Sequence, residues 1–267
     1  RIKVISFTGS TNVGIKIADT ANKRLARVSL ELGGKNPFIV CDDADIENAV
    51  HWAVLSAFSN AGQRCASGSR LIVFKDIYAT FKEKLLLKTA SLKLGIEADC
   101  DLGPVVNKKQ QENILKAIDN IKLDNGVILC GGVAPSDEHL ANGFYVEPTI
   151  IEGLSQEAYL NKHEVFGPLA TLTKVENIYE ALNVANDSSY GLTSSIHTRD
   201  INKAIWFAKN VKSGVANINF GTYGSEPHMP FGGFGLSGNG SREPGTEAIN
   251  VYSELKNISI LSSSEVI

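Results

Sequence analysis

The stretch that decides the fold is PFIVCDDADIENAVHWAVLSAFSNAGQRCASGSRLIVF, residues 37–74. Its ends, PFIVC and RLIVF, are short apolar runs rich in β-branched residues, which predict two buried strands. Between them, Asp45 is placed to cap a helix, and apolar residues recur from Ile46 to Ala57 at the three- and four-residue spacing of one helical face. The stretch therefore predicts a buried helix that leads through a polar loop into a buried strand.

The same alternation of strands and helices continues on both sides of this stretch. Further strands are predicted at 3–9, 26–31, 127–130, 169–175, 193–198 and 215–219, and helices at about 12–23, 77–92, 108–121, 178–185 and 201–211. Strands that alternate with helices indicate an α/β fold with a mostly parallel sheet covered on both faces. The last segment, 249–260, reads as extended, and we expect an edge strand that pairs elsewhere.

Composition limits the function classes. The chain has 267 residues, 26 Lys and Arg against 29 Asp and Glu, and 43% apolar residues. These values are those of a globular protein of one or two domains. The net charge of −3 is not that of a nucleic-acid-binding protein. We expect neither a nucleic-acid nor a membrane partner, since no apolar run approaches the roughly 20 residues of a membrane span.

The cysteines and histidines are scattered. None of the 4 cysteines forms a C-x-x-C pair, and the 5 histidines are equally dispersed, so we expect no metal site. Unclustered thiols in a chain of this length indicate a reducing compartment, for which we take the cytoplasm. The only methionine is Met229, and the chain opens at Arg1 within a predicted strand. We therefore expect a longer parent, with precursor processing as the alternative.

Cys65 is the candidate nucleophile. It lies in the polar loop NAGQRCASGSR, where Arg64 could favour the thiolate and free backbone N–H groups could stabilise an oxyanion. The alternative is a buried thiol that packs as a small apolar residue. Cys41 and Cys130 end apolar strands and are interpreted as packing residues.

Glu31 is the candidate general base. In SLELGGKNP it lies between two leucines at the end of an apolar strand. An apolar site would raise its pKa from the usual value of about 4.3 towards the working pH. The alternative is a strand-end carboxylate that reaches water.

Two further motifs fit a nucleotide. In FTGST, Gly9 and Ser10 lie between a strand and a helix, where free N–H groups favour a phosphate, although a plain helix cap explains the same residues. In HEVFGP, Glu164 could accept from two ribose hydroxyls and Phe166 could pack beside a sugar or nicotinamide. The alternative for this second motif is a simple turn.

Together these segments resemble the aldehyde dehydrogenase superfamily. FTGST, LELGGKNP, GQRC, EVFGP and PFGGFGLSGNG occur in that order, and the resemblance runs from about Val4 to Ile260. It implies an aldehyde dehydrogenase-like catalytic domain that oxidises a small aldehyde to a carboxylic acid with NAD, or alternatively NADP. In that reaction a thiohemiacetal on the cysteine loses hydride, and the resulting thioester is hydrolysed.

The resemblance also implies residue roles. It assigns the nucleophile to Cys65, the base to Glu31, cofactor contacts to Gly9, Ser10, Leu32, Glu164 and Phe166, and an aromatic wall of the aldehyde tunnel to Phe231. The backbone N–H of Cys65 would be one oxyanion donor.

The family's domain plan implies three parts. Residues 1–33 would be the tail of a Rossmann-like cofactor domain, 34–236 the catalytic α/β domain and 237–267 a C-terminal segment with an oligomerisation strand. We expect a homo-oligomer, dimeric or tetrameric. The family's adenine-binding strands, its oxyanion-hole asparagine and its bridging strand would precede Arg1, so we expect this stretch alone to bind cofactor weakly.

Two other functions stay open from the sequence. A cysteine hydrolase or esterase would pair Cys65 with His163 or His228, oriented by Asn or Asp. A catalytically silent structural fragment is the other alternative. The residues do not name the aldehyde.

Overall fold

The computed structural model describes residues 1–261, apart from the side chains of residues 122 and 123. The strands are β1 (Val4–Thr8), β2 (Arg27–Glu31), β3 (Pro37–Val40), β4 (Arg70–Phe74), β5 (Val127–Cys130), β6 (Thr149–Glu152), β7 (Leu169–Val175), β8 (Tyr190–Gly191), β9 (Thr193–His197), β10 (Val215–Ile218) and β11 (Phe234–Gly235). The helices are α1 (Thr11–Asn22), α2 (Ile46–Phe58), α3 (Lys75–Ala90), α4 (Lys108–Asp119), α5 (Tyr159–Lys162), α6 (Ile178–Asn186), α7 (Ile201–Asn210) and α8 (Ala248–Tyr252), with 3-10 turns η1 (Ser59–Gly62), η2 (Asn120–Asp124) and η3 (Glu138–Leu140).

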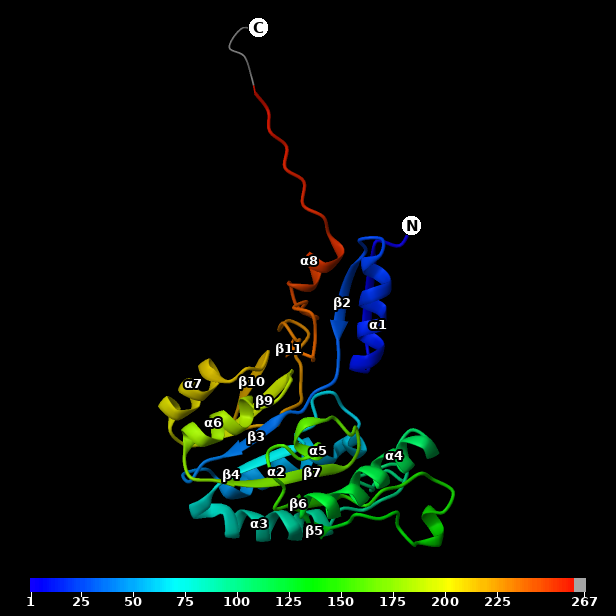
Figure 1. Cartoon of the computed structure of the whole chain (residues 1–267). Coiled ribbons are helices and arrows are strands. Elements are labelled where there is room, and N and C mark those ends of the chain that lie inside the picture. The colour runs from blue at the N-terminus through cyan, green and yellow to red at the C-terminus, as the bar shows by residue number, and fades with distance from the viewer. Residues whose placement is uncertain (262–267) are drawn as a thin grey trace.

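A seven-stranded sheet forms the body of the molecule, in the order β10-β9-β3-β4-β7-β6-β5. All neighbouring strands are parallel except β5 and β6, which are antiparallel. The predicted α/β fold with a mostly parallel sheet is therefore confirmed. In Figure 1, α2 and α3 lie against one face of this sheet, and α6 and α7 lie near its other face.

The strand β3 shows why both faces need helices. Phe38 and Val40 pack into a core cluster with residues of α2 and α3, whereas Ile39 packs with residues of α6 and α7. Successive side chains of a strand point to opposite faces, so a continuous apolar run requires cover on both sides. This run is the sequence feature from which the parallel sheet was predicted.

Helix α2 and the turn after it set the direction of the Cys65 loop. The side chain of Asp45 accepts a hydrogen bond from the backbone N–H of Asn48 at 3.1 Å, so the predicted cap is confirmed. After the helix, Asn60, Ala61 and Gly62 have φ values of 55°, 52° and 66°. A Cβ on Gly62 would lie 2.0 Å from the carbonyl oxygen of Gly167, so only glycine permits this approach. The loop before Cys65 is thereby held against the loop after Phe166.

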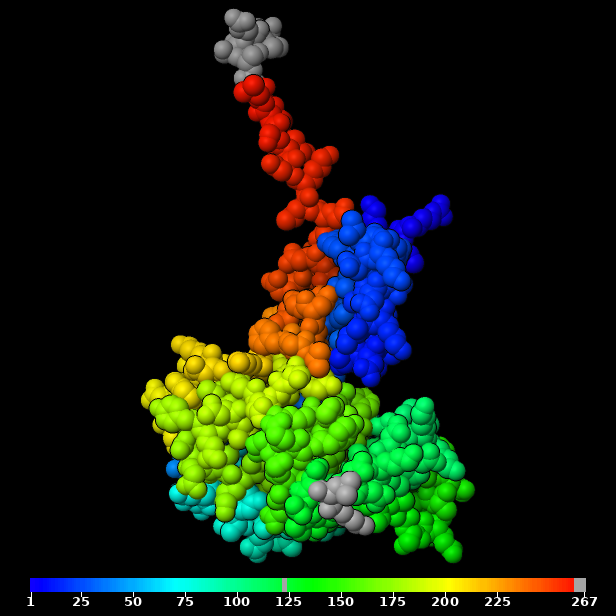
Figure 2. All heavy atoms as spheres, viewed as in Figure 1, coloured from blue at the N-terminus to red at the C-terminus, as the bar shows by residue number. Residues whose placement is uncertain are grey.

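The first thirty residues form a separate unit. β1 and β2 pair in parallel as a two-stranded sheet, with α1 connecting them. This unit packs beside the glycine-rich C-terminal segment, as the blue and orange regions of Figure 2 show. Glu31 makes a β-bridge with Gly238, and the hydroxyl of Ser29 donates to Glu243 at 2.6 Å.

The prediction for the C-terminal segment was wrong in part. Residues Ala248–Tyr252 form helix α8, and residues 253–261 pair with no strand of the described chain. Leu255 and Ile260 are almost fully exposed, and Figure 1 shows the segment running away from the body. An extended segment forms a ladder only where a neighbouring strand offers hydrogen bonds, and residues 1–261 offer none there. Residues 262–267, the end of the predicted C-terminal segment 237–267, lie outside the described residues.

No helix within residues 1–261 has the length and apolar character needed to cross a bilayer.

Candidate active site

A cleft of about 1040 Å³ opens at the junction of the two-stranded unit and the seven-stranded body. It brings together seven predicted site residues: Gly9, Ser10, Leu32, Cys65, Glu164, Phe166 and Phe231. Glu31 does not itself line the cleft, but the next two residues, Leu32 and Gly33, do. Segments far apart in the sequence therefore meet around the thiol.

Asn36 fixes the loop that carries Cys65. Its buried side-chain amide donates to the carbonyl oxygens of Cys65 at 2.8 Å and Ser67 at 2.9 Å, and its oxygen accepts from the backbone N–H of Thr193 at 3.0 Å. Hydrogen bonds that use donor and acceptor together hold a buried amide in one orientation. This residue was not predicted; an amide just before a buried strand, two positions after a glycine pair, was the only pointer to it.

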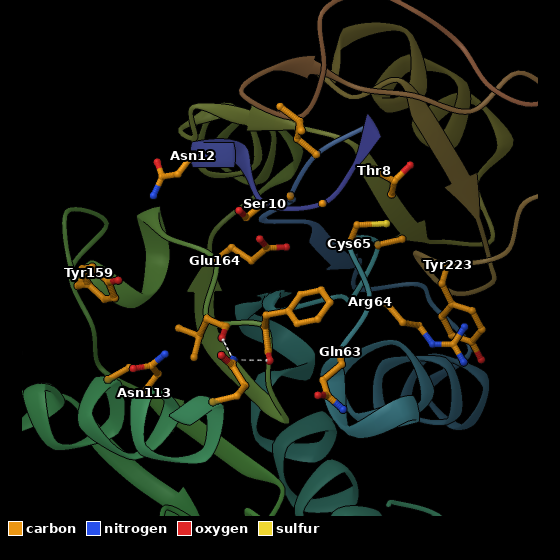
Figure 3. Close-up of a pocket in the computed structure, with 18 of the residues that line it drawn as sticks. Thr8, Ser10, Asn12, Gln63, Arg64, Cys65, Asn113, Tyr159, Glu164 and Tyr223 are labelled. Carbon is orange, nitrogen blue, oxygen red and sulfur yellow. Dashed lines mark hydrogen bonds between the residues drawn. The ribbon is translucent and has the colours of Figure 1, made fainter. Parts of the chain in front are cut away.

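The thiol of Cys65 is held in its neutral form. Burial raises its pKa most, the charges of Glu164 and Glu31 raise it further, and the backbone N–H groups of Ala66 and Cys65 lower it. The prediction that Arg64 favours the thiolate was wrong. Its guanidinium lies over the ring of Tyr223 at 4.8 Å, and in Figure 3 it points towards Tyr223. A base is therefore needed to take the proton of this thiol.

Glu31 is a buried carboxyl group without a partner. It is 7% exposed, and both its oxygens lack a hydrogen bond within the described chain. Burial raises its pKa to about 8, against a lowering by the charge of Arg242. A Cβ on Gly232 would lie only 2.7 Å from Oε1, so the glycine leaves room for the carboxylate. The group can hold or release a proton near neutral pH, as predicted from its apolar neighbours.

Glu164 lies in the cleft and has a partner. Its Oε1 accepts from the backbone N–H of Gly34 at 3.1 Å, while burial raises its pKa. The amide of Gln110 donates to the carbonyl oxygens of Val165 and Phe166, both at 2.9 Å, so the loop behind Glu164 is fixed. Figure 3 shows Glu164 on one side of Cys65 and Arg64 on the other.

The start of α1 keeps N–H groups available. Ser10 occupies the cap position, but its hydroxyl makes no capping hydrogen bond. The hydroxyl of Thr11 donates to the carbonyl oxygen of Leu236 at 3.2 Å instead. A plain helix cap therefore does not account for Ser10, and the positive end of the helix faces the cleft beside Gly9.

Lys35 is the second residue that sequence reasoning missed. It is 2% exposed, its Nζ has no hydrogen-bond partner among the described residues, and burial lowers its pKa to about 7. Arg70, also fully buried, is satisfied by the carbonyl oxygens of Lys35, Val184 and Ala185. Lysine is rarely buried without a partner, so no residue pattern predicted this position.

No histidine is among the residues that line the cleft in the described chain. The ring of His163 stacks on Tyr159 with centroids 4.3 Å apart, and His228 is exposed. Among the described residues, the hydrolase alternative therefore has no histidine in the cleft to act as its base. Among the described residues there is also no group of three His, Cys, Asp or Glu side chains able to hold a metal.

Comparison with known proteins matches this arrangement to one family. The sequence profile of the aldehyde dehydrogenase family matches residues 1–258. The chain is 39% identical over 96% of its length to alpha-ketoglutaric semialdehyde dehydrogenase of Bacillus subtilis, and 37% identical over 95% to betaine aldehyde dehydrogenase of Mesorhizobium japonicum. It covers 53% and 52% of those relatives.

Solved structures match the chain to the same family. Betaine aldehyde dehydrogenase of Staphylococcus aureus, determined in complex with NAD+, superposes with a TM-score of 0.91 at 36% identity, over 94% of this chain and 50% of the other. The chain belongs to the aldehyde dehydrogenase family. It spans about half the length of the curated relatives it matches.

Proposed function

We propose that the protein oxidises a small aldehyde to a carboxylic acid with NAD, using Cys65 as nucleophile and Glu31 as general base. The observation that carries the proposal is the pairing of a half-buried neutral thiol with a carboxyl group that acts on its pKa and is itself buried, unpartnered and has a pKa of about 8. A second ionisable group poised near neutral pH beside a nucleophile is typical of a catalytic site.

In the first step the sulfur of Cys65 bonds to the aldehyde carbon. The thiol proton leaves to a base, for which Glu31 is assigned, and the carbonyl oxygen becomes an oxyanion. In the described chain the backbone N–H groups of Cys65 and Ala66 donate to no backbone carbonyl, which leaves them available to this oxygen. The product is a thiohemiacetal whose carbon still carries its hydrogen.

The cofactor half of the cleft fits a nicotinamide nucleotide. The uncapped start of α1 at Ser10 suits a phosphate, and the carboxylate of Glu164, held by Gly34, suits ribose hydroxyls. A Cβ on Gly33 would lie 2.3 Å from Oε2 of Glu164, so this glycine gives the carboxylate its space. Gly9, Leu32 and Phe166 would complete the contacts. When bound, the nicotinamide accepts the hydride and leaves a thioester on Cys65.

Hydrolysis of the thioester returns the enzyme to its starting state. Glu31 first releases the thiol proton to solvent. It then takes a proton from water as the water oxygen bonds to the acyl carbon, and the sulfur leaves and regains a proton from Glu31. A base matched to the working pH is worth roughly 10²–10⁴ in rate. Phe231, which lines the cleft, is assigned to the wall that shields the acyl group.

NAD is preferred over NADP because the solved relative of Staphylococcus aureus is bound to NAD+. The relatives' names include both a semialdehyde and betaine aldehyde, so names alone do not choose the substrate. We also propose the division at 1–33, 34–236 and 237–267, and a cytoplasmic location, which the four unpaired cysteines support. A homo-oligomer, dimeric or tetrameric, fits the exposed apolar side chains of residues 255–261.

The test is aldehyde-dependent formation of NADH by the protein, with Cys65→Ala as the inactive variant and Cys130→Ala as the matched control. We expect NADH from the parent and the control and none from Cys65→Ala. Equal rates in all three proteins, or NADH formation that survives loss of Cys65, would overturn the proposal.

A further inference from the structure

Glu164 lies on one side of Cys65 in the cleft, and the cleft also has a second side, across the thiol from Glu164. Arg64 and Tyr223 line it, and Figure 3 shows them on this side of the thiol. Since the cofactor is assigned to the side of Glu164, the far end of the aldehyde has to occupy this one. The residues found here therefore select the substrate.

Arg64 is a positioned cation without an anion. Its guanidinium lies 4.8 Å from the ring centroid of Tyr223, and Trp52 of α2 packs edge-on against the same ring at 6.3 Å. Arg64 is exposed in the cleft, and within residues 1–261 it makes no salt bridge and its side chain donates no hydrogen bond. A stacked guanidinium keeps its charge and its fork of N–H donors free for a carboxylate.

The charges around the cleft favour the same ligand. Glu164 is the only acidic residue that lines it in the described chain, whereas Arg64 and Lys116 are cationic. A quaternary ammonium group is recognised by open aromatic faces or by carboxylates. The face of Tyr223 is already covered by Arg64, and the carboxylate of Glu164 lies across the thiol.

We propose that the aldehyde oxidised at Cys65 carries a carboxylate at its far end, bound by Arg64, so that the substrate class is the semialdehydes. The inference rests on the proposed function and adds its specificity. Arg64 and Cys65 line the same cleft, so an aldehyde bound at Cys65 can place a second, anionic group against the guanidinium. Glu164 lies on the other side of the thiol, which leaves the Arg64 side as the place for an anion.

The first test needs neither cofactor nor aldehyde. Cys65 is modified with two methanethiosulfonate reagents of similar size, one bearing an ethylsulfonate and one an ethyltrimethylammonium group, and the rate at Cys65 is followed by peptide mass spectrometry. Arg64→Gln should lower the ratio of anionic to cationic rates about tenfold. Arg64→Lys should retain most of the ratio, and Arg199→Gln, at an exposed arginine paired with Asp45, should leave it unchanged. A ratio that Arg64→Gln leaves within twofold of the parent overturns the inference.

The second test compares substrates in the NAD-dependent assay. We expect 4-oxobutanoate to exceed butanal in kcat/KM, and Arg64→Gln to lower the value for 4-oxobutanoate roughly 30-fold or more while changing butanal less than threefold. If butanal is oxidised equally well and Arg64→Gln affects both alike, the inference falls and the dehydrogenase proposal stands. If no aldehyde yields NADH, the proposed function fails, whatever the reagent ratios show.

Discussion

Glu31 and Glu164 both raise the pKa of Cys65, yet their surroundings differ. Glu164 lines the cleft and is held by the N–H of Gly34, whereas Glu31 lies behind the lining with both oxygens unpartnered. A carboxylate with a fixed donor is suited to hold a ligand. One without a donor has a pKa that burial moves to about 8, which suits proton transfer. Glu164 is therefore assigned to ligand binding and Glu31 to proton transfer, although both are glutamates.

The largest effect should come from exchanging each acid for its amide. Glu31→Gln removes the base for thiol deprotonation and for thioester hydrolysis, so we expect a slower burst of one NADH per site followed by turnover slowed roughly 10²–10⁴-fold. Glu164→Gln should slow the first NADH formation and give no burst. The measurement is stopped-flow absorbance of NADH, with the exposed Glu138→Gln as control. Bursts in both variants, or in neither, would contradict the separate roles of Glu31 and Glu164.

The pH profile should follow Glu31 alone. The base is active when deprotonated, so the rate of hydrolysis should rise about tenfold per pH unit below its pKa of about 8 and level above it. Glu31→Gln should flatten this rise, whereas Glu164→Gln should preserve it. A steady-state profile between pH 6 and 9 checks the point, and a rise that persists in Glu31→Gln counts against the assignment.

Two glycines that lie against these carboxyl groups allow each acid to be displaced without being replaced. A Cβ on Gly232 meets Oε1 of Glu31 at 2.7 Å, and one on Gly33 meets Oε2 of Glu164 at 2.3 Å. Gly232→Ala should slow hydrolysis about tenfold by displacing the base. Gly33→Ala should weaken NAD binding instead and leave hydrolysis within threefold. The paired measurements are the hydrolysis rate and the apparent KM for NAD.

The smallest effect is expected on stability. The pKa of Glu31 is raised in the fold, so the folded protein binds more protons than the unfolded chain between pH 4.5 and about 8, and Glu31 makes stability fall across that window. The pKa of Lys35 is lowered, so Lys35 makes stability rise between about pH 7 and 10.5. Urea unfolding of the parent at different pH values should show both slopes, each at most roughly 1.4 kcal/mol per pH unit. The first slope should disappear in Glu31→Gln and the second in Lys35→Met. Unchanged slopes would contradict the burial of these charges.

The sequence predicted the sheet because its cause is local. Apolar runs such as residues 37–41 and the capped stripe after Asp45 carry their own periodicity, and the structure has β3 and α2 there. The cleft was predicted through motifs, which placed Cys65 and Glu164 in it. The misprediction at 249–252, which belong to α8, has the opposite cause, because the conformation of this short segment depends on neighbours that its own residues do not specify.

The electrostatics of the site could not be predicted in this way. That Arg64 turns to Tyr223, more than 150 residues further along, and that Lys35 is buried without a partner depend on the packing of distant segments. Adjacency in sequence suggested a contact between Arg64 and the thiol that the loop geometry does not make. Asn36 likewise gains its role only because Thr193 of β9 lies next to it.

The lifetime of an acyl group on Cys65 tests the central claim most directly. The protein is acetylated with p-nitrophenyl acetate without cofactor, quenched in acid at intervals and digested, and the acetyl group on the Cys65 peptide is quantified by mass spectrometry. The account predicts a short-lived acetyl group on Cys65 in the parent and in Glu164→Gln, and one that lasts at least about 10²-fold longer in Glu31→Gln. Equal lifetimes in the parent and Glu31→Gln, or acetylation that favours Cys100 or Cys130, would contradict it.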